Sequence, residues 1–261
     1  MESFMSEIKI VTYNLRNQWH RDEQNGFIHR VGLMYHIIER EQPDIIAFQE
    51  VMARQLEVLE KMLPDYMFVG QGREADFQGE GLYVAVKKST FQFCGMEVFW
   101  LSPQPYVPAT RFETQSECPR ICVDVLVRHK ETGKMIRVYD VHLDHIESEA
   151  KAQGMQVVLD KMAEDQAKVA CEAVLLGDFN EEPHGPAITY CHAYDKLKIV
   201  DLTADIPGTC HDFGRREPYK IDYIFATEGL AADVVNVEAW TTVHSGIYLS
   251  DHYPVSATFK A

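Results

Sequence analysis

Short apolar runs alternate with amphipathic segments along the first quarter of the chain. Residues 7–14 (EIKIVTYN) and 44–51 (DIIAFQEV) are short and largely apolar, which predicts two strands. Residues 26–42 and 52–63 carry apolar side chains at helical spacing, and each segment stops before a proline, which predicts two helices. This strand–helix–strand–helix order predicts a layered α/β fold.

Strand-like segments dominate the rest of the chain. Residues 131–145 contain the turn Thr132-Gly133 before a strand, which predicts a hairpin. A helical segment at 148–168 precedes a buried strand at 172–177, and Pro186 opens a short helix near 186–193. We therefore expect two packed sheets flanked by helices, in one domain over residues 1–261. The other segments predicted as strands are 66–72, 81–88, 91–102, 120–130, 219–226, 232–240 and 253–259.

Composition and charge limit the classes of molecule that the protein is expected to bind. The 261 residues are 46% hydrophobic and 25% charged, which is ordinary for a globular protein. The formal net charge is −15, and no run of Lys and Arg forms a basic stripe. The chain is therefore a poor binder of long DNA or anionic membrane. A small phosphorylated substrate is still compatible, because a bound cation reverses the local field.

Cysteine spacing and hydropathy indicate the cellular compartment in which the protein is expected to lie. The six cysteines are scattered and form no C-x-x-C pair, so we expect free thiols. The N-terminal stretch MESFMSEIKIV lacks the basic flank and apolar core of a signal peptide. No apolar run approaches the roughly 20 residues of a membrane span. The chain is expected to be soluble and cytoplasmic.

Polar residues stand at or within six strand-like segments: four segments end in them, one carries Asp222, and the last is preceded by Asp251 and His252. A buried carboxylate is costly unless it is paired or bound to a metal, so this repeated layout predicts that the strand ends share one site. The residues concerned are Asn14, Gln49 and Glu50, His142 with Asp144 and His145, Asp178 and Asn180, Asp222, and Asp251 with His252.

Three of these residues predict a metal site. Asn14, Glu50 and Asp251 offer hard oxygen ligands, which suit Mg²⁺ or Mn²⁺. No cysteine pair or helical His spacing indicates structural zinc. Taken alone, Glu50 could instead cap the helix at 52–63, and Asn14 could belong to a turn.

The remaining polar residues suit proton transfer and charge stabilisation. Asp178 could deprotonate a water, and Asn180 could hold that water or an oxyanion. His142 and His252 could donate to a charged oxygen, although a lone histidine such as His142 is often only a satisfied interior residue. An oxygen-ligated metal, histidines and an activated water together fit phosphoester hydrolysis.

The chain resembles the endonuclease/exonuclease/phosphatase superfamily, which includes deoxyribonucleases, apurinic endonucleases, deadenylases, inositol-phosphate phosphatases and sphingomyelinases. The resemblance runs from about Ile8 to Phe259, and GDFN, SDH and a QE pair in this order are specific. FWLS, PRIC and HLDH resemble a compact bacterial branch. The matching segments are VTYNLR, PDIIAFQEV, VHLDH, LLGDFNEEP, KIDYIFA and SDHYPVSA.

This resemblance implies a four-layer α/β/β/α sandwich and metal-dependent cleavage of a phosphate ester. It implies that Glu50 is the main metal ligand, helped by Asn14 and Asp251. The other implied roles are positioning or deprotonating the attacking water for Asp178, steadying it for Asn180, contacting the scissile phosphate for His142 and His252, and fixing the His252 tautomer for Asp222.

Several residues are candidates for substrate binding. Arg16 stands where some nucleases of the superfamily carry a further acid, so it could meet a substrate phosphate instead. Arg120, His145 and His211 are further candidates, although Arg120 could instead pair with an acid and His145 could belong to a surface turn. Lys220 is expected to be a solvated charge at a strand end.

Three functions remain open on sequence alone. The leading one is a Mg²⁺- or Mn²⁺-dependent phosphoesterase acting on a small molecule, because the acidic surface opposes a polymeric substrate. The second is a nuclease acting on oligonucleotides, which needs a basic groove with exposed aromatics. The third is a catalytically silent binding module, which predicts the loss of an essential residue, and none is lost.

Overall fold

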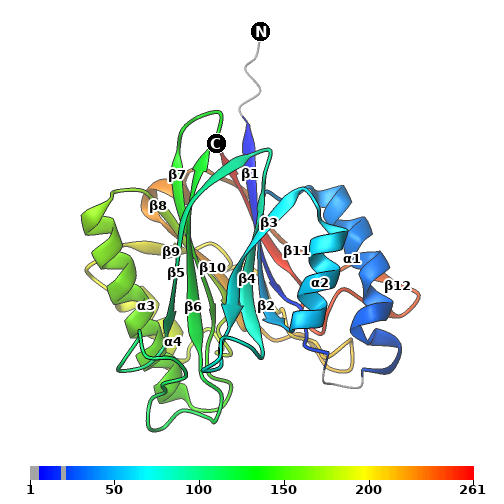
Figure 1. Ribbon diagram of the computed structural model, residues 1–261, viewed down its shortest axis with the longest axis horizontal. Coiled ribbons are helices and arrows are strands. Elements are labelled where there is room, and N and C mark those ends of the chain that lie inside the picture. The colour runs from blue at the N-terminus through cyan, green and yellow to red at the C-terminus, as the bar shows by residue number, and fades with distance from the viewer. Residues whose placement is uncertain (1–5, 19–21) are drawn as a thin grey trace.

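Two six-stranded sheets packed face to face form the centre of the computed structural model, which describes residues 6–18 and 22–261 (Figure 1). The first sheet has the order β11-β14-β1-β2-β4-β3 and the second the order β5-β6-β7-β8-β10-β9. The first sheet contains β1 (Glu7–Asn14), β2 (Ile45–Val51), β3 (Tyr66–Gly72), β4 (Gly81–Lys87), β11 (Val234–Ala239) and β14 (Val255–Lys260). The second contains β5 (Phe91–Trp100), β6 (Ile121–His129), β7 (Met135–His142), β8 (Glu172–Asp178), β9 (Ile199–Asp201) and β10 (Asp222–Thr227).

Helices cover the outer face of each sheet. Helices α1 (Phe27–Glu41) and α2 (Ala53–Met62) pack on the first sheet, and α3 (Ser148–Lys168) and α4 (Pro186–Ala193) pack on the second (Figure 1). A core of Ile, Val, Leu and Phe side chains lies between the two sheets. The predicted four-layer α/β/β/α sandwich is therefore confirmed. The smaller elements are a 3₁₀ turn at Glu23–Asn25, α5 (Glu228–Ala232), and the paired strands β12 (Val243–His244) and β13 (Ile247–Tyr248).

One parallel strand pair near the middle of each sheet sets the position of the site. Strand β1 runs parallel to β2, with Asn14 beside Gln49, and β7 runs parallel to β8, with His142 beside Asp178. Parallel strands bring their carboxyl ends to the same edge. Antiparallel β10 adds its first residue, Asp222, opposite Asp178. Both sheets thus present polar residues at one end of the sandwich.

Most predicted elements appear at the expected places. The helices at 148–168 and 186–193 match α3 and α4, and the hairpin at Thr132-Gly133 joins β6 to antiparallel β7. Strand β10 begins at Asp222 rather than at 219, because Tyr219 pairs instead with Cys210. All six cysteines are free.

The expectation of a solvated Lys220 is wrong. Lys220 is buried, and its Nζ donates to the Thr203 carbonyl at 2.6 Å and to Asp201 Oδ2 at 3.3 Å. The end of β9 and the chain directly after it supply these partners.

No helix among residues 6–18 and 22–261 has the length and apolarity needed to cross a bilayer. Residues 1–5 of the stretch expected not to be a signal peptide lie outside the described residues.

Candidate active site

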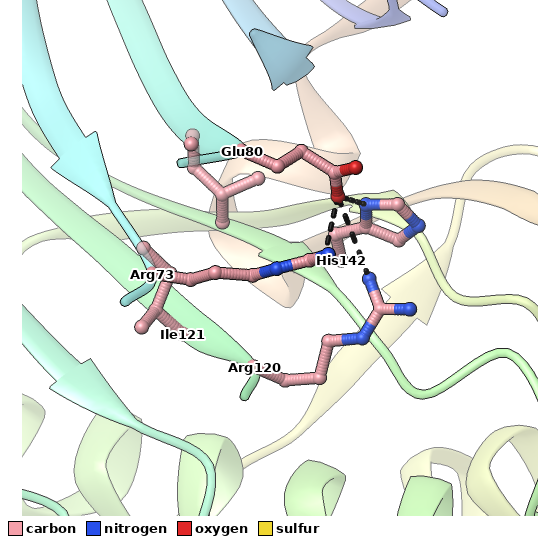
Figure 2. Close-up of a pocket in the computed structure, with 7 residues that line it drawn as sticks. Arg73, Glu80, Arg120, Ile121 and His142 are labelled. Atoms are coloured by element: carbon pink, nitrogen blue, oxygen red, sulfur yellow. Dashed lines mark hydrogen bonds and ion pairs between the residues drawn. The ribbon is translucent and has the colours of Figure 1, made fainter. Parts of the chain in front are cut away.

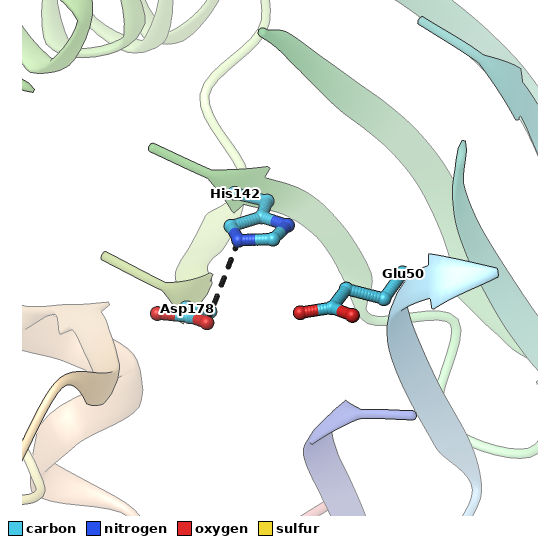
Figure 3. Close-up of side chains that lie close together, drawn as sticks. All are labelled: Glu50, His142 and Asp178. Carbon is cyan, nitrogen blue, oxygen red and sulfur yellow. Dashed lines mark ion pairs between the residues drawn. The ribbon is translucent and has the colours of Figure 1, made fainter. Parts of the chain in front are cut away.

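The polar strand ends meet in an open cleft of about 440 Å³ at one end of the sandwich. Both sheets contribute to its wall: Glu50 comes from the first sheet, and His142 and Asp178 come from the second (Figure 3). The other lining residues that matter below are Arg16, Asn17, Arg73, Glu80, Arg120, His145, Asn180, Asp251 and His252.

Glu50 reaches the cleft through a break in the regular pairing of β2. The β2–β4 register shifts between Phe48 and Val51, and Glu50 itself has a φ of 62°, a left-handed conformation that is unusual for a non-glycine residue. Its carboxylate accepts hydrogen bonds from the backbone N of Asn17 at 2.8 Å and from Asn14 Nδ2 at 3.0 Å. Burial alone would raise the pKa of Glu50, but these two donors hold it below its ordinary value. Glu50 is therefore an anion at neutral pH.

Asn14 joins the carboxylates of the two sheets. Its Nδ2 donates to Glu50 Oε1 and also to Asp178 Oδ2 at 2.8 Å, while its Oδ1 accepts from the backbone N of Arg16 at 2.9 Å. The amide is thus satisfied at both ends, and Glu50 and Asp178 are held close to each other.

Asp178 lies at the end of the buried strand β8 and is only 2% exposed. Its Oδ1 accepts from the backbone N of Asn180 at 2.8 Å, and Asn180 adopts a left-handed φ of 49° to make this turn. Gly177, just before it, has a φ of 139°, and a Cβ there would lie 1.9 Å from the Val141 carbonyl oxygen. Burial and the neighbouring Asp222 raise the pKa of Asp178 to about 7.

His142 stands between two acids. Its Nε2 lies 3.5 Å from Asp178 Oδ2, and its Nδ1 lies 3.7 Å from Glu80 Oε1 (Figures 2 and 3). Burial, with the positive charge of Arg120, lowers the pKa of His142 well below its ordinary value. The ring is therefore neutral and can donate through one nitrogen only.

His252 forms a close pair with Asp222. Its Nδ1 lies 2.8 Å from Asp222 Oδ2, and its Nε2 lies 4.0 Å from Asp178 Oδ2. Burial would lower the pKa of His252, but the charge and hydrogen bond of Asp222 outweigh it and raise that pKa well above the ordinary value. The pair therefore presents a cationic Nε2–H to the cleft, and the hydrogen bond to Asp222 holds the ring in place.

A family model described as the endonuclease/exonuclease/phosphatase family matches residues 11–252, which is most of the chain. The chain belongs to this family. It is therefore a metal-dependent phosphoesterase, a hydrolase of phosphoester bonds.

Solved structures agree with this assignment. The chain is 27% identical to an endonuclease/exonuclease/phosphatase from Bacteroides vulgatus, with 97% of this chain and 98% of that chain covered and a TM-score of 0.89. It is 25% identical to a mannosyl-6-phosphatase from Bacteroides thetaiotaomicron, covering 96% and 98% of the two chains with a TM-score of 0.85. D. rerio TDP2, solved with a single-strand DNA product, is 16% identical over 98% and 100% of the two chains with a TM-score of 0.75, and shows only that the fold is shared.

The donor set suits the divalent metal of this family. One ligand atom each from Glu50, His142 and Asp178 lies within 4.8 Å of the others, and the same holds for Asp178, Asp222 and His252. The first set pairs two carboxylates on opposite sheets. Because His142 is neutral, it supplies no positive charge to balance these two carboxylates. A hard cation between the sheets would supply that charge.

Two predicted ligands are turned toward other partners. Asn14 presents its amide nitrogen to Glu50 and Asp178, so ligation through Oδ1 requires the amide to turn over. Asp251 lines the cleft, but its Oδ2 lies 3.3 Å from Arg16 Nη1 and its Oδ1 accepts from Ser250. Their ligand roles remain predictions.

The four predicted substrate-binding residues differ in their surroundings. Arg16 lines the cleft and forms ion pairs with Asp22 and Asp251. Arg120 and His145 also line it, and Arg120 Nη2 lies 3.1 Å from His145 Nδ1.

His211 lies behind this wall. It stacks on Tyr253 at 3.9 Å between ring centroids and accepts from the backbone N of Gly214. Burial and His252 lower the pKa of His211 to about 4, so it supports the wall as a neutral ring.

Sequence reasoning missed Arg73 and Glu80, which both line the cleft. Arg73 directly follows β3 and Glu80 directly precedes β4. Arg73 is a polar residue directly after a strand, which is the pattern that predicted other residues of the site, so the sequence could have indicated it. Glu80 stands before its strand, and only the antiparallel pairing of β3 with β4 brings it to the same edge.

Proposed function

We propose that this protein hydrolyses a small phosphate monoester with the help of Mg²⁺, by in-line attack of water on phosphorus. The observation that carries the proposal is the meeting of Glu50, His142, Asp178 and His252, from four separate strand ends, around one cleft. These groups supply an anion for metal binding, an acceptor for a water proton and a cationic donor for the phosphoryl oxygens.

Glu50, helped by Asn14 and Asp251, would hold the cation. A bound Mg²⁺ supplies positive charge that offsets the charge on the phosphoryl oxygens. The hydrogen bonds from Asn14 and the Asn17 backbone keep Glu50 ionised and fixed in place.

Asp178 would accept the proton of the attacking water. Asn14 and the backbone of Asn180 fix its two oxygens, so the acceptor does not need to reorient during the reaction. The Asn180 amide, which also lines the cleft, would steady the water or a phosphoryl oxygen.

His252 and His142, whose Nε2 atoms both lie near Asp178 Oδ2, would contact the phosphoryl group. His252 remains cationic because Asp222 lies 2.8 Å from its Nδ1, so its Nε2–H is the stronger donor. A preorganised donor of this kind stabilises the charge that develops on phosphorus-bound oxygens.

Size and charge support a small substrate. The cleft of about 440 Å³ is of the size that takes a small molecule, and the net charge of −15 disfavours a polyanion. The 25% identical mannosyl-6-phosphatase supports a phosphate monoester of a sugar or similar alcohol. The free thiols fit a reducing compartment, and we propose the cytoplasm as its location.

A panel of phosphate mono- and diesters, assayed with Mg²⁺ and with Mn²⁺, tests this proposal. We expect metal-dependent release of phosphate from monoesters by the wild type, and a loss of kcat of about 10²-fold or more in Asp178→Ala. Cleavage of diesters alone would contradict the monoester assignment. Normal metal binding without turnover of any ester would favour a silent binding module.

Calorimetric titration with Mn²⁺ tests the metal site. Glu50→Ala should weaken metal affinity about 10-fold or more, because it removes a carboxylate whose pKa is held low by two hydrogen-bond donors. Unchanged affinity would remove Glu50 from this role.

A further inference from the structure

A small side recess opens from the cleft on the far side of His142. It encloses about 10 Å³ and is lined by Arg73, Glu80, Arg120 and His142, with the backbone and apolar atoms of β4 and β6 behind them (Figure 2). About 10–15 Å³ is the room that a single water-sized group needs. The recess therefore has room for at most one such group.

The polar side chains converge on one carboxylate oxygen. Glu80 Oε1 accepts from Arg73 Nη1 and lies 4.0 Å from Arg120 Nη1 and 3.7 Å from His142 Nδ1 (Figure 2). Glu80 Oε2 accepts from Asn17 Nδ2 at 3.1 Å. A carboxylate offers about four acceptor sites, so Glu80 can accept a further hydrogen bond.

Arg120 has unused donors at this place. It is 4% exposed, and neither its Nε nor its Nη1 has a hydrogen-bond partner among the described residues. Buried donors without partners are rare and costly. Its guanidinium points toward Glu80 and His142 in Figure 2, so a group in the recess would be within its reach.

The recess selects by size and by hydrogen-bonding pattern. A phosphoryl group exceeds the space, and its unprotonated oxygens would face the Glu80 carboxylate. A cation would face two guanidinium groups, and a methyl group would leave the arginine donors unpaired. A hydroxyl group fits, because it can donate to Glu80 while it accepts from Arg120.

We infer that this recess binds one hydroxyl group of the alcohol part of the substrate, so that the enzyme selects phosphate esters of sugars or other polyols over simple alkyl phosphates. The inference rests on the proposed function, because the phosphate must sit in the main cleft. His142 lines both the recess and the cleft, with Nδ1 3.7 Å from Glu80 Oε1 and Nε2 3.5 Å from Asp178 Oδ2, so the hydroxyl in the recess would stand on a carbon near the ester oxygen.

Matched esters test the inference with the wild-type enzyme. The pairs are glycerol 1-phosphate against propyl phosphate, and a hexose 6-phosphate against its 4-deoxy counterpart. A hydrogen bond to a buried charged group predicts a kcat/KM ratio of about 10 to 100 in favour of the hydroxylated ester in at least one pair.

Two variants locate the source of that selectivity. In Glu80→Gln the ratio should fall to within about 3-fold of one, since the amide replaces one of the two acceptor oxygens by a donor NH₂ group. Glu74→Gln is the matched control: Glu74 belongs to the same loop and lies 3.8 Å from Arg73 Nε, but its side chain is 47% exposed and does not line the recess. Its ratio should stay at the wild-type value.

Titration calorimetry with the corresponding phosphonates separates this inference from the proposed function. Turnover of monoesters with ratios near one in both pairs would overturn the hydroxyl recess and leave the phosphatase intact. Without any turnover, tighter binding of the hydroxylated phosphonate would support the recess while the proposed hydrolysis fails. Equal binding of both phosphonates without turnover would overturn both.

Discussion

Asp140 provides a sharp test of the electrostatics between the two sheets. It lies in β7 with no exposed surface, on the face that packs against the first sheet. Its Oδ1 accepts from Gln49 Nε2 at 2.7 Å, and its Oδ2 has no partner among the described residues. Burial raises the pKa of Asp140 well above its ordinary value, and the single donor from Gln49 offsets this only in part. Asp140 should therefore be a neutral acid in the folded protein.

The sign and size of the effect follow from proton linkage. Above the pKa of the unfolded carboxyl, the unfolded chain has lost the Asp140 proton, while the raised pKa lets the folded chain keep it, so the free energy of unfolding falls as pH rises toward the folded-state pKa. The slope for one proton is about 1.4 kcal/mol per pH unit. Asp140→Asn keeps the shape and the bond from Gln49 but does not titrate. Its stability relative to wild type should therefore rise as pH increases above the ordinary carboxyl pKa, by at most about 1.4 kcal/mol per pH unit.

Urea denaturation of both proteins at pH 5, 6 and 7 measures this difference. Glu131→Gln, an exposed acid in the β6–β7 turn, is the control for a change in net charge and should show no comparable slope. A constant difference between Asp140→Asn and wild type across these pH values would mean that Asp140 is ionised in the fold, and the reasoning would be refuted.

Two further substitutions probe the geometry of the site. Asp222→Asn should lower kcat about 10²- to 10⁴-fold and move the alkaline limit of activity to lower pH, because His252 loses the carboxylate that keeps it cationic. The pH–rate profiles of this variant and of the wild type measure the shift. An unshifted alkaline limit would count against the His252–Asp222 pair. Gly177→Ala should lower the free energy of unfolding by about 3 kcal/mol or more, because its Cβ would lie 1.9 Å from the Val141 carbonyl oxygen at a φ of 139°. Thermal denaturation measures this loss. A loss below about 1 kcal/mol would show that the backbone can adjust.

The catalytic side of the cleft could be predicted because its residues directly follow apolar strands. Asn14, Glu50, His142 and Asp178 each stand at the carboxyl end of a strand in a parallel pair, so sequence position alone places them at one edge. The alternating and apolar segments of the sequence also predict the layers of the sandwich and most of the positions at which helices and strands begin and end.

Other features depend on contacts between distant segments, which a local pattern does not contain. Asp140 occupies an ordinary position in the sequence pattern of β7. Its burial follows only from the packing of β2, which belongs to the other sheet, against it. The ion pair of Arg16 with Asp251 joins residues 235 positions apart along the chain, so neither sequence motif could show that the two charges offset each other. The buried position of Lys220 has the same origin.

The place of β14 in the first sheet has a consequence for folding. This strand pairs with β1 on one side and β11 on the other, so Lys260 must meet Glu7 across most of the chain before the sheet is complete. Pairing of such distant segments carries a loop-closure cost and slows folding. Because His252 lies just before β14, a refolding enzyme should regain activity only after this sheet has closed.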